Sequence, residues 1–396
     1  MERGVPADRG VWTAPSDVRQ RVTRLLCDLV AIPSHGGEDG AIIRFLADRF
    51  TRQHIPCRIS ELGGKPINVV AEIGAGPRTI VLNSHHDTVP PGDPALWTTD
   101  PLTPVELDGK IYGRGAGDAK GCLAAMVVAF EALAEGREAL PAKVVLMAVG
   151  EEERGGLGTM TEATRGLRAD AAIVGESTQL VPMIAHKGVL RLEVEVAGKA
   201  AHASEPEAGV NAITAMAPII SALDKLGVEV RERTEVHTGS ASLVISTISG
   251  GVALNVIPAR CVISIDRRVL PNETEAGATR EIVETVNRAL PAVPGVRLDV
   301  RKVRFVPPAI TDPAAPIVAA AEEAASAVLG GSVRAAGFTA TCDMTYLVNV
   351  AKIPTIILGP DSIELAHQAN ECVSIEQMAL AVEVYLKTVE AWVRRA

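Results

Sequence analysis

The chain has 396 residues, 47% of them hydrophobic but only 3% aromatic, and a formal net charge of −9. That length suits two domains or one large one, and the negative charge, with no basic stripe, argues against nucleic-acid partners and polybasic membrane contacts. No apolar run reaches the roughly 18 residues of a membrane span, and residues 1–21 do not resemble a signal peptide, so we expect a soluble, cytoplasmic protein.

The first part of the chain alternates predicted helices with short apolar strands. Helices are predicted over 17–32, 40–52 and 120–133, where apolar residues recur at helical spacing. Apolar runs typical of buried parallel strands occupy four ranges: 79–83, 143–149, 171–174 and 353–358. This alternation predicts an α/β domain with a mostly parallel sheet flanked by helices.

The section over 188–306 has a different pattern. Residues 189–196 and 261–266 alternate apolar with charged or polar side chains, which indicates a half-exposed antiparallel sheet, and 211–225 predicts an amphipathic helix. We expect this section to be an inserted α+β domain. It would divide the first domain into residues 1–187 and 307–396, with a further helix at 315–329. The six scattered cysteines form no Cys-x-x-Cys pair, so reduced thiols are predicted.

Polar residues follow the predicted strands where each one ends. His85, the pair Glu152 and Glu153, Glu176 and His367 come after four different strands. Asp118 precedes a helix within a glycine-rich loop. Since ligands bind beyond the carboxyl ends of parallel strands, we expect these side chains to meet at one edge. Imidazole and carboxylate donors with a spare glutamate, Glu152, as base are typical of a two-metal hydrolase site.

The local sequence around His85 and Asp118 refines this interpretation. His85 and Asp87 are two residues apart, so an extended segment places both on one side, and Asp87 is expected to accept the imidazole's other N–H. A structural histidine in a turn is the alternative. The loop before Asp118 could instead cradle a phosphate, but Lys120-Gly121 lacks the Walker order of glycine, lysine and serine or threonine.

The motifs resemble those of the acetylornithine deacetylase, succinyl-diaminopimelate desuccinylase, aminoacylase and carboxypeptidase G family over nearly the whole chain. The family's His-x-Asp-x-x-Pro is matched in full at 85–90, and His-x-x-Asn-Glu at 367–371. The resemblance implies metal ligands at five positions, with the aspartate bridging both ions: His85, Asp118, Glu153, Glu176 and His367. Ser177 stands where the family usually has proline.

The acidic run at 151–153 has two possible alignments. The family reads Asp-Glu-Glu-x-Gly-x-x-Gly, and matching Gly155 and Gly158 makes Glu152 the general base and Glu153 the ligand. A shift by one residue would make Glu151 the base. The alternative is that residues 151–153 are only a solvent-exposed acidic run with no functional role. A strongly apolar strand, however, leads directly into this run.

The insertion carries further family motifs. Gly-x-x-x-His-x-Ser-x-Pro, over 198–206, implies that His202 reaches the partner subunit's active site and donates to an oxyanion. A surface histidine is the alternative. Asn255 and Arg268 match substrate positions, and a guanidinium suits a substrate carboxylate. The adjacent Arg267 leaves open which arginine faces the substrate. Thr341 and Asp343 carry only a weak signal as pocket residues.

The resemblance implies a homodimeric amidohydrolase that carries two Zn²⁺ per chain, with Co²⁺ or Mn²⁺ as alternatives. Its substrate would be a small N-acyl amino acid, cleaved to a free amino acid and a carboxylate. Two other functions are weighed against it. A dipeptidase or carboxypeptidase would share the metal chemistry and differ only in its pocket. A non-catalytic binding or scaffold protein on the same fold would be expected to lack ligands or the base, and metal analysis would distinguish it.

Overall fold

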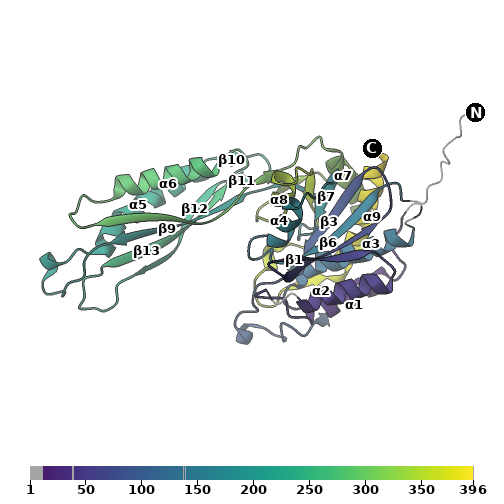
Figure 1. The fold of residues 1–396 in the computed structure, drawn as a ribbon, viewed down its shortest axis with the longest axis horizontal. Coiled ribbons are helices and arrows are strands. Elements are labelled where there is room, and N and C mark those ends of the chain that lie inside the picture. Colours follow the sequence, from purple (N-terminus) through teal and green to yellow (C-terminus); the bar gives the residue numbers. More distant parts are fainter. Residues whose placement is uncertain (1–11, 38–39, 137, 139, 396) are drawn as a thin grey trace, which may run out of the picture. The chain divides into compact units, whose positions relative to one another are not determined.

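The computed structural model describes residues 12–37, 40–136, 138 and 140–395. They form two compact units (Figure 1). The first contains the chain up to Ile184, Thr311–Ala336 and the residues from Cys342 on; the second contains Ala185–Ile310 and Gly337–Thr341. The predicted fold class is confirmed: an α/β layered unit with a parallel core to its sheet accompanies a separate antiparallel sheet with its own helices.

Four parallel strands form the centre of the first unit's sheet. They are, in spatial order, β6 (Lys143–Val149), β3 (Thr79–His85), β7 (Ala171–Val174) and β17 (Thr355–Ile357). On one side the sheet continues through antiparallel strands β2 (Lys65–Ile73) and β1 (Cys57–Leu62), and on the other through β8 (Met183–His186). The carboxyl ends of the four parallel strands therefore lie at one edge.

Helices cover both faces of this sheet. One face shares a single hydrophobic core with α1 (Val18–Val30), α2 (Gly40–Arg52), α3 (Gly121–Glu135), α7 (Pro316–Leu329) and α9 (Ile375–Arg394). Ile80 and Leu82 of β3 point into that core, so the intervening Asn83 points to the other face. There Asn83 contacts α4 (Leu157–Thr164), which packs against α8 (Met344–Asn349).

Several short strands accompany the longer elements. They are β4 (Val105–Leu107), β5 (Lys110–Tyr112), β10 (Thr234–Glu235), β11 (Gly239–Ser240), β15 (Ala309–Ile310), β16 (Ala336–Phe338) and β18 (Cys372–Ser374).

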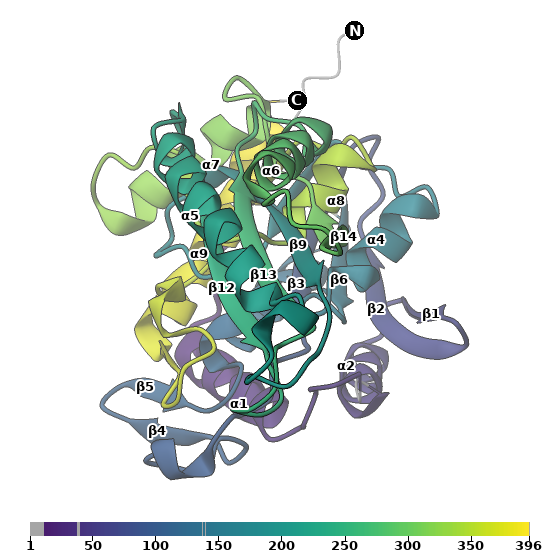
Figure 2. The same cartoon turned by 90° about the vertical axis from the view of Figure 1, so that its left-hand side faces the viewer.

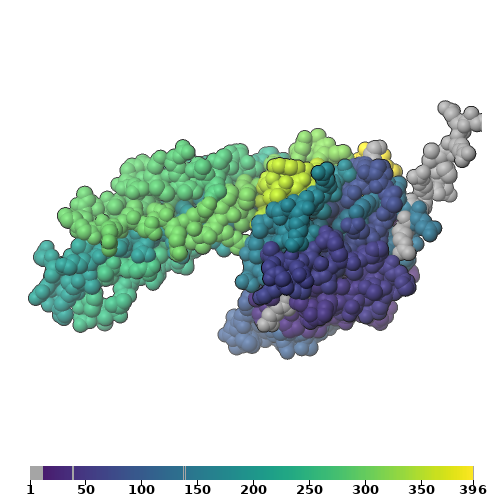
Figure 3. All heavy atoms as spheres, viewed as in Figure 1, coloured from purple at the N-terminus to yellow at the C-terminus, as the bar shows by residue number. Residues whose placement is uncertain are grey.

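In the space-filling view, the visible surface of the first unit shows purple and teal segments beside a yellow-green one (Figure 3). This unit is therefore built from chain on both sides of the insertion.

The second unit is a four-stranded antiparallel sheet with two helices on one face. Its strand order is β12 (Ser242–Gly250), β13 (Arg260–Val269), β9 (Gly188–Ala197) and β14 (Arg297–Val306). The helices α5 (Ala212–Arg231) and α6 (Glu275–Ala289) lie side by side across it (Figure 2). Alternate strand residues, such as Ile263 and Ile265 of β13, are buried beneath them.

Two element boundaries differ from the prediction for clear reasons. The strand predicted over 353–358 begins at Thr355, directly after Pro354, whose nitrogen has no hydrogen to donate to a ladder. The helix predicted over 211–225 continues to Arg231, because Leu226 and Val230 extend its buried stripe. Among the described residues, no helix combines the length and apolar character that a membrane crossing requires.

Candidate metal centre

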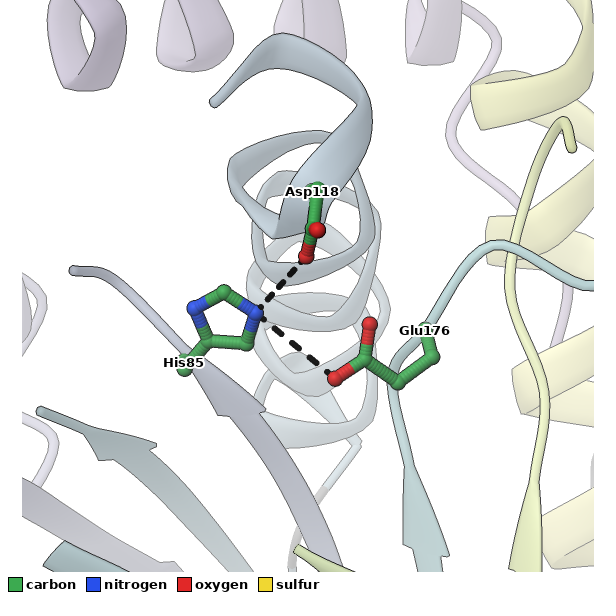
Figure 4. A group of neighbouring side chains, drawn as sticks. All are labelled: His85, Asp118 and Glu176. Carbon is green, nitrogen blue, oxygen red and sulfur yellow. Dashed lines mark hydrogen bonds and ion pairs between the residues drawn. The ribbon is translucent and has the colours of Figure 1, made fainter. Parts of the chain in front are cut away.

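Five of the predicted site residues come together in the first unit as two overlapping triads. One triad contains His85, Asp118 and Glu176, and the other contains Asp118, Glu153 and His367. Within each triad the possible ligand atoms all lie within 4.8 Å of one another. Figure 4 shows the His85 ring facing both carboxylates of the first triad, which come from different elements. Asp118 belongs to both groups.

Each oxygen of Asp118 faces a different histidine. Oδ1 lies 3.0 Å from His85 Nε2, and Oδ2 lies 3.2 Å from His367 Nε2. His85 Nε2 is also 3.6 Å from Glu176 Oε1, while His367 Nε2 is 2.9 Å from Glu153 Oε1. Donors about 2.1 Å from a tetrahedral ion would be separated by about 3.4 Å, so the spacing of each triad suits one cation. Asp118 has the arrangement of a bridging carboxylate.

The end of β3 orients the His85 ring through the backbone. His85 Nδ1 lies 3.0 Å from the Asp87 carbonyl oxygen, which can only accept, so Nδ1 carries a proton and Nε2 is the nitrogen that faces Asp118 and could coordinate a metal ion. The predicted acceptor was the Asp87 carboxylate, but its Oδ1 is farther away, at 3.6 Å. That carboxylate also accepts the backbone N–H groups of Glu152 and Glu153, at 3.1 and 3.2 Å. Asp87 therefore holds the acidic turn in place.

A buried carboxylate on another loop holds the backbone that leads into Asp118. Glu371 is 1% exposed and accepts backbone N–H groups of Gly115, Gly117 and Asp118, at 3.1, 2.9 and 2.9 Å. It also pairs with buried Arg114 at 2.6 Å. Both carboxylate oxygens of Glu371 thus accept hydrogen bonds from this loop. The position of Asp118 between the two histidines depends on that set of bonds.

The neighbouring Lys120 does not present its ammonium group to the loop. Its side chain is 1% exposed, and Nζ donates to the carbonyl oxygens of Leu29 and Ile32, at 2.9 and 3.0 Å. Those carbonyls lie at the end of α1 and just beyond it, where helices leave acceptors unsatisfied. Because a phosphate-binding loop needs this cation at the anion, the phosphate alternative loses its main contact.

The three glutamates of the acidic turn have different partners. Glu151 has a φ of 64° and forms an ion pair with Arg154 at 3.2 Å, away from both triads. Glu152 adjoins the centre: burial raises its pKa well above the usual value, His85 opposes that rise, and the charges of Glu176 and other nearby carboxylates add to it. Glu152, rather than Glu151, is therefore the better candidate for a base.

The charges in the centre fit cations. Although burial opposes the charge on His85, bonds to Asp118 and Asp87 raise its pKa well above the usual value. Bonds to Asp118 and Glu153 raise the pKa of His367 to about 10. Burial also raises the pKa of Glu176. The raised pKa values favour the protonated forms of these groups, as expected for a carboxylate-rich centre with few cationic side chains. Two divalent ions would supply positive charge, and the nitrogen and carboxylate donors suit zinc.

The second unit holds His202 and Asn255 side by side. The Ala203 N–H donates to the Asn255 carbonyl, and the His202 side chain is exposed. The Ser204 N–H donates to His202 Nδ1 at 3.2 Å, so in the neutral ring the proton lies on Nε2. His202 therefore presents a donor at its free nitrogen, which is what an oxyanion requires.

The two adjacent arginines on β13 have different environments. Arg267 is completely buried and donates to Glu273 at 2.5 Å and to the Arg268 carbonyl. Arg268 has a side chain 33% exposed and pairs with Asp266 at 2.8 Å. Arg267 is thus part of the fold, and Arg268 is the arginine that a ligand could reach.

Arg268 and His202 lie at opposite ends of the second unit's sheet. Arg268 pairs with Val189 at the start of β9, whereas β9 ends at Ala197. These two β9 residues are eight positions apart, which corresponds to about 26 Å along a strand. Backbone pairing continues past Ala197 toward His202, since the Ile257 N–H donates to the Ala201 carbonyl. One small molecule cannot touch both residues of the same chain.

Comparison with known proteins places the chain in a family. Residues 81–391 match the family model "Peptidase family M20/M25/M40". An acetylornithine deacetylase of Proteus mirabilis is 32% identical over 365 residues, 88% of this chain and 90% of the relative.

Two solved structures share the fold over almost the whole chain. The M20 family metallo-carboxypeptidase Sso-CP2 of Sulfolobus solfataricus has a TM-score of 0.79 at 20% identity, covering 94% of this chain and 99% of that one. The YXEP protein of Bacillus subtilis, described as a dinuclear metal binding peptidase, has a TM-score of 0.71 at 19% identity, covering 95% and 98%. The resemblance inferred from the motifs is confirmed, and the chain belongs to peptidase family M20/M25/M40, a family of metal-dependent hydrolases.

Proposed function

We propose that this enzyme hydrolyses the amide bond of an N-acyl amino acid, releasing the free amino acid and a carboxylate. Two divalent metal ions would be held by the two triads, with Asp118 bridging them. The observation that carries the proposal is the shared Asp118, each of whose oxygens faces a different histidine, with Glu152 beside them. The acetylornithine deacetylase relatives support the choice of a deacetylase-type substrate.

Bound divalent ions in such a centre polarise a carbonyl group and lower the pKa of water. Within that setting the protein's own residues move the protons. Glu152 takes a proton from the attacking water and later gives it to the leaving amine. Asp87 supports this exchange indirectly, because its carboxylate fixes the backbone of the turn that bears Glu152. Zinc is the proposed metal, with cobalt or manganese as substitutes.

The proposal is tested by amine release from a panel of substrates. Chelator-treated enzyme would be assayed on N-acetyl, N-succinyl and N-formyl amino acids, acetylornithine among them, and on simple dipeptides, before and after zinc is added. We expect amine release from one class of N-acyl amino acid, and we expect it only after zinc has been added. Release from dipeptides alone would assign the dipeptidase function instead. Full activity in the chelated enzyme, or a wild-type chain that binds no metal, would overturn the proposal.

We further propose that the second unit is a lid through which two chains form a homodimer. The support is the separation, along one sheet, of Arg268 from His202 and Asn255. If all three residues serve substrates, then Arg268 serves one site and the other two serve a different site. A second copy of the chain provides that other site with the fewest additional assumptions.

One edge of the lid sheet is suited to such pairing. β12 is an edge strand, and its Val244 and Ile248 are 55% and 58% exposed. Unpaired backbone groups and exposed apolar side chains on an edge strand favour association with another chain. The opposite edge, β14, instead carries Arg301 and Lys302, paired with Glu193 and Glu275 within the unit.

Mixing two inactive variants checks the dimer. His202→Ala and Glu152→Gln are each expected to be nearly inactive alone. If His202 acts in the partner's site, each mixed dimer has one complete site, so equal amounts exchanged at random should recover about a quarter of wild-type activity. Size-exclusion chromatography with light scattering would establish that the chains exchange. Exchange of chains without recovered activity would contradict the assignment of His202.

A further inference from the structure

Another buried carboxylate outside the two triads adjoins the metal centre. Asp343, at the start of α8, is 2% exposed. Its Oδ2 accepts the hydroxyl of Thr159 at 2.6 Å, and that hydroxyl accepts from Asn83 Nδ2 at 2.7 Å. Thr159 and Asn83 are themselves completely buried. This chain of bonds fixes the carboxylate against α4 and links it through Thr159 to the end of β3.

The other oxygen of Asp343 faces the turn that follows the acidic run. Oδ1 is buried and has no hydrogen-bond partner, and a Cβ added at Gly156 would come within 2.5 Å of it. Tyr346, one turn along α8, donates its hydroxyl to the Gly155 carbonyl at 2.5 Å. Asp343 is therefore packed directly against the backbone of the segment that bears Glu152 and Glu153.

No lysine or arginine among the described residues forms an ion pair with Asp343. Burial raises the pKa of Asp343 to about 6, while Thr159 and the charge of His85 oppose that rise. A buried carboxylate with one unsatisfied oxygen and carboxylates for neighbours destabilises the metal-free protein.

We propose that Asp343 is a positioning and charge-balancing residue of the metal centre, which increases the affinity for the metal ions without coordinating them. Thr159 and Asn83 hold the negative charge of Asp343 in a fixed place. Cations bound at the triads would compensate that charge in place of a cationic side chain. The inference rests on the proposed two-metal function. If Asp343 served packing alone, its carboxylate would stabilise the metal-free protein. The charge-balancing role predicts that the carboxylate destabilises the metal-free protein.

The test measures zinc affinity and metal-free stability in the same variants. Asp343→Asn keeps the shape and can still accept from Thr159 but removes the charge. We expect zinc affinity, measured by competition with a chromogenic chelator, to fall about ten- to a hundredfold, since a charge near a divalent ion acts strongly at low dielectric. We also expect the metal-free melting temperature to stay equal or rise.

Matched variants separate charge from packing. Glu162→Gln changes a different buried carboxylate, on the neighbouring α4 and bonded to Asn68 and Arg58, and should leave zinc affinity unchanged. Thr159→Val keeps the charge of Asp343 and should lower affinity less than D343N does. Asp343→Ser, a second neutral variant, must also lose affinity. Wild-type affinity in either neutral variant, or a lowered metal-free melting temperature in D343N, overturns the inference; a wild type that binds no zinc overturns the proposed function instead.

Discussion

Glu152→Gln is expected to lower kcat about a thousandfold or more while both metal ions remain bound. Glutamine has nearly the same shape but cannot take a proton from water, and general-base catalysis contributes roughly that factor. Removing this carboxylate leaves all five proposed ligands in place. Metal content, measured by elemental analysis on the same preparation as kcat, should therefore stay at two ions per chain.

Glu151→Gln is the matched control for that variant. Glu151 precedes Glu152 in the same turn, but its carboxylate pairs with Arg154. We expect its kcat to remain within a fewfold of wild type, because the lost pair is partly exposed and such pairs contribute little. A large loss in Glu151→Gln together with an active Glu152→Gln would show that the other alignment of the acidic run is correct.

The second large effect concerns stability. Glu371→Ala should lower the free energy of unfolding of the metal-free protein by about 3–5 kcal/mol, because Arg114 is left buried without its anion. Three backbone N–H groups around Asp118 lose their acceptor at the same time. Urea denaturation in the presence of a chelator measures this effect without the contribution of bound metal.

A double variant tests the cause of that loss. Arg114→Met removes the cation, so Glu371→Ala in that background should cost clearly less than in wild type. Equal costs in both backgrounds would show that the ion pair is not responsible. We also expect weaker zinc binding in Glu371→Ala, since the loop that presents Asp118 is no longer held.

The strands and the metal-centre residues were predictable because the signals are local. His85, Glu153 and Glu176 each follow an apolar run, and the parallel arrangement of those runs brings their ends together. His367 was predictable from its motif, although its left-handed φ of 64° was not. Residues that need only their immediate neighbours to be recognised were therefore found from the sequence.

The residues that support the centre depend on distant partners. Arg114 and Glu371 are 257 positions apart, and although Glu371 ends the motif at 367–371, neither local sequence indicates the other as its partner. Asp343 contacts Thr159 across 184 positions. The Asp87 carbonyl oxygen was not predicted as an acceptor for His85; it lies nearer to Nδ1 than the predicted carboxylate does, and side-chain spacing contains no information on backbone acceptors. Likewise, Gly337–Thr341 joins the second unit through contacts that no local pattern indicates.

The division of the first unit by the insertion has a consequence for synthesis on the ribosome. A nascent chain that has emerged as far as Glu176 already contains four of the five proposed ligands, but β17 and His367 are still nearly 200 codons away. The sheet then has an open edge at β7, where β17 will pair. Fragments that end before His367 therefore lack a complete second triad, and metal occupancy of both proposed sites would report that translation has passed the codon for His367.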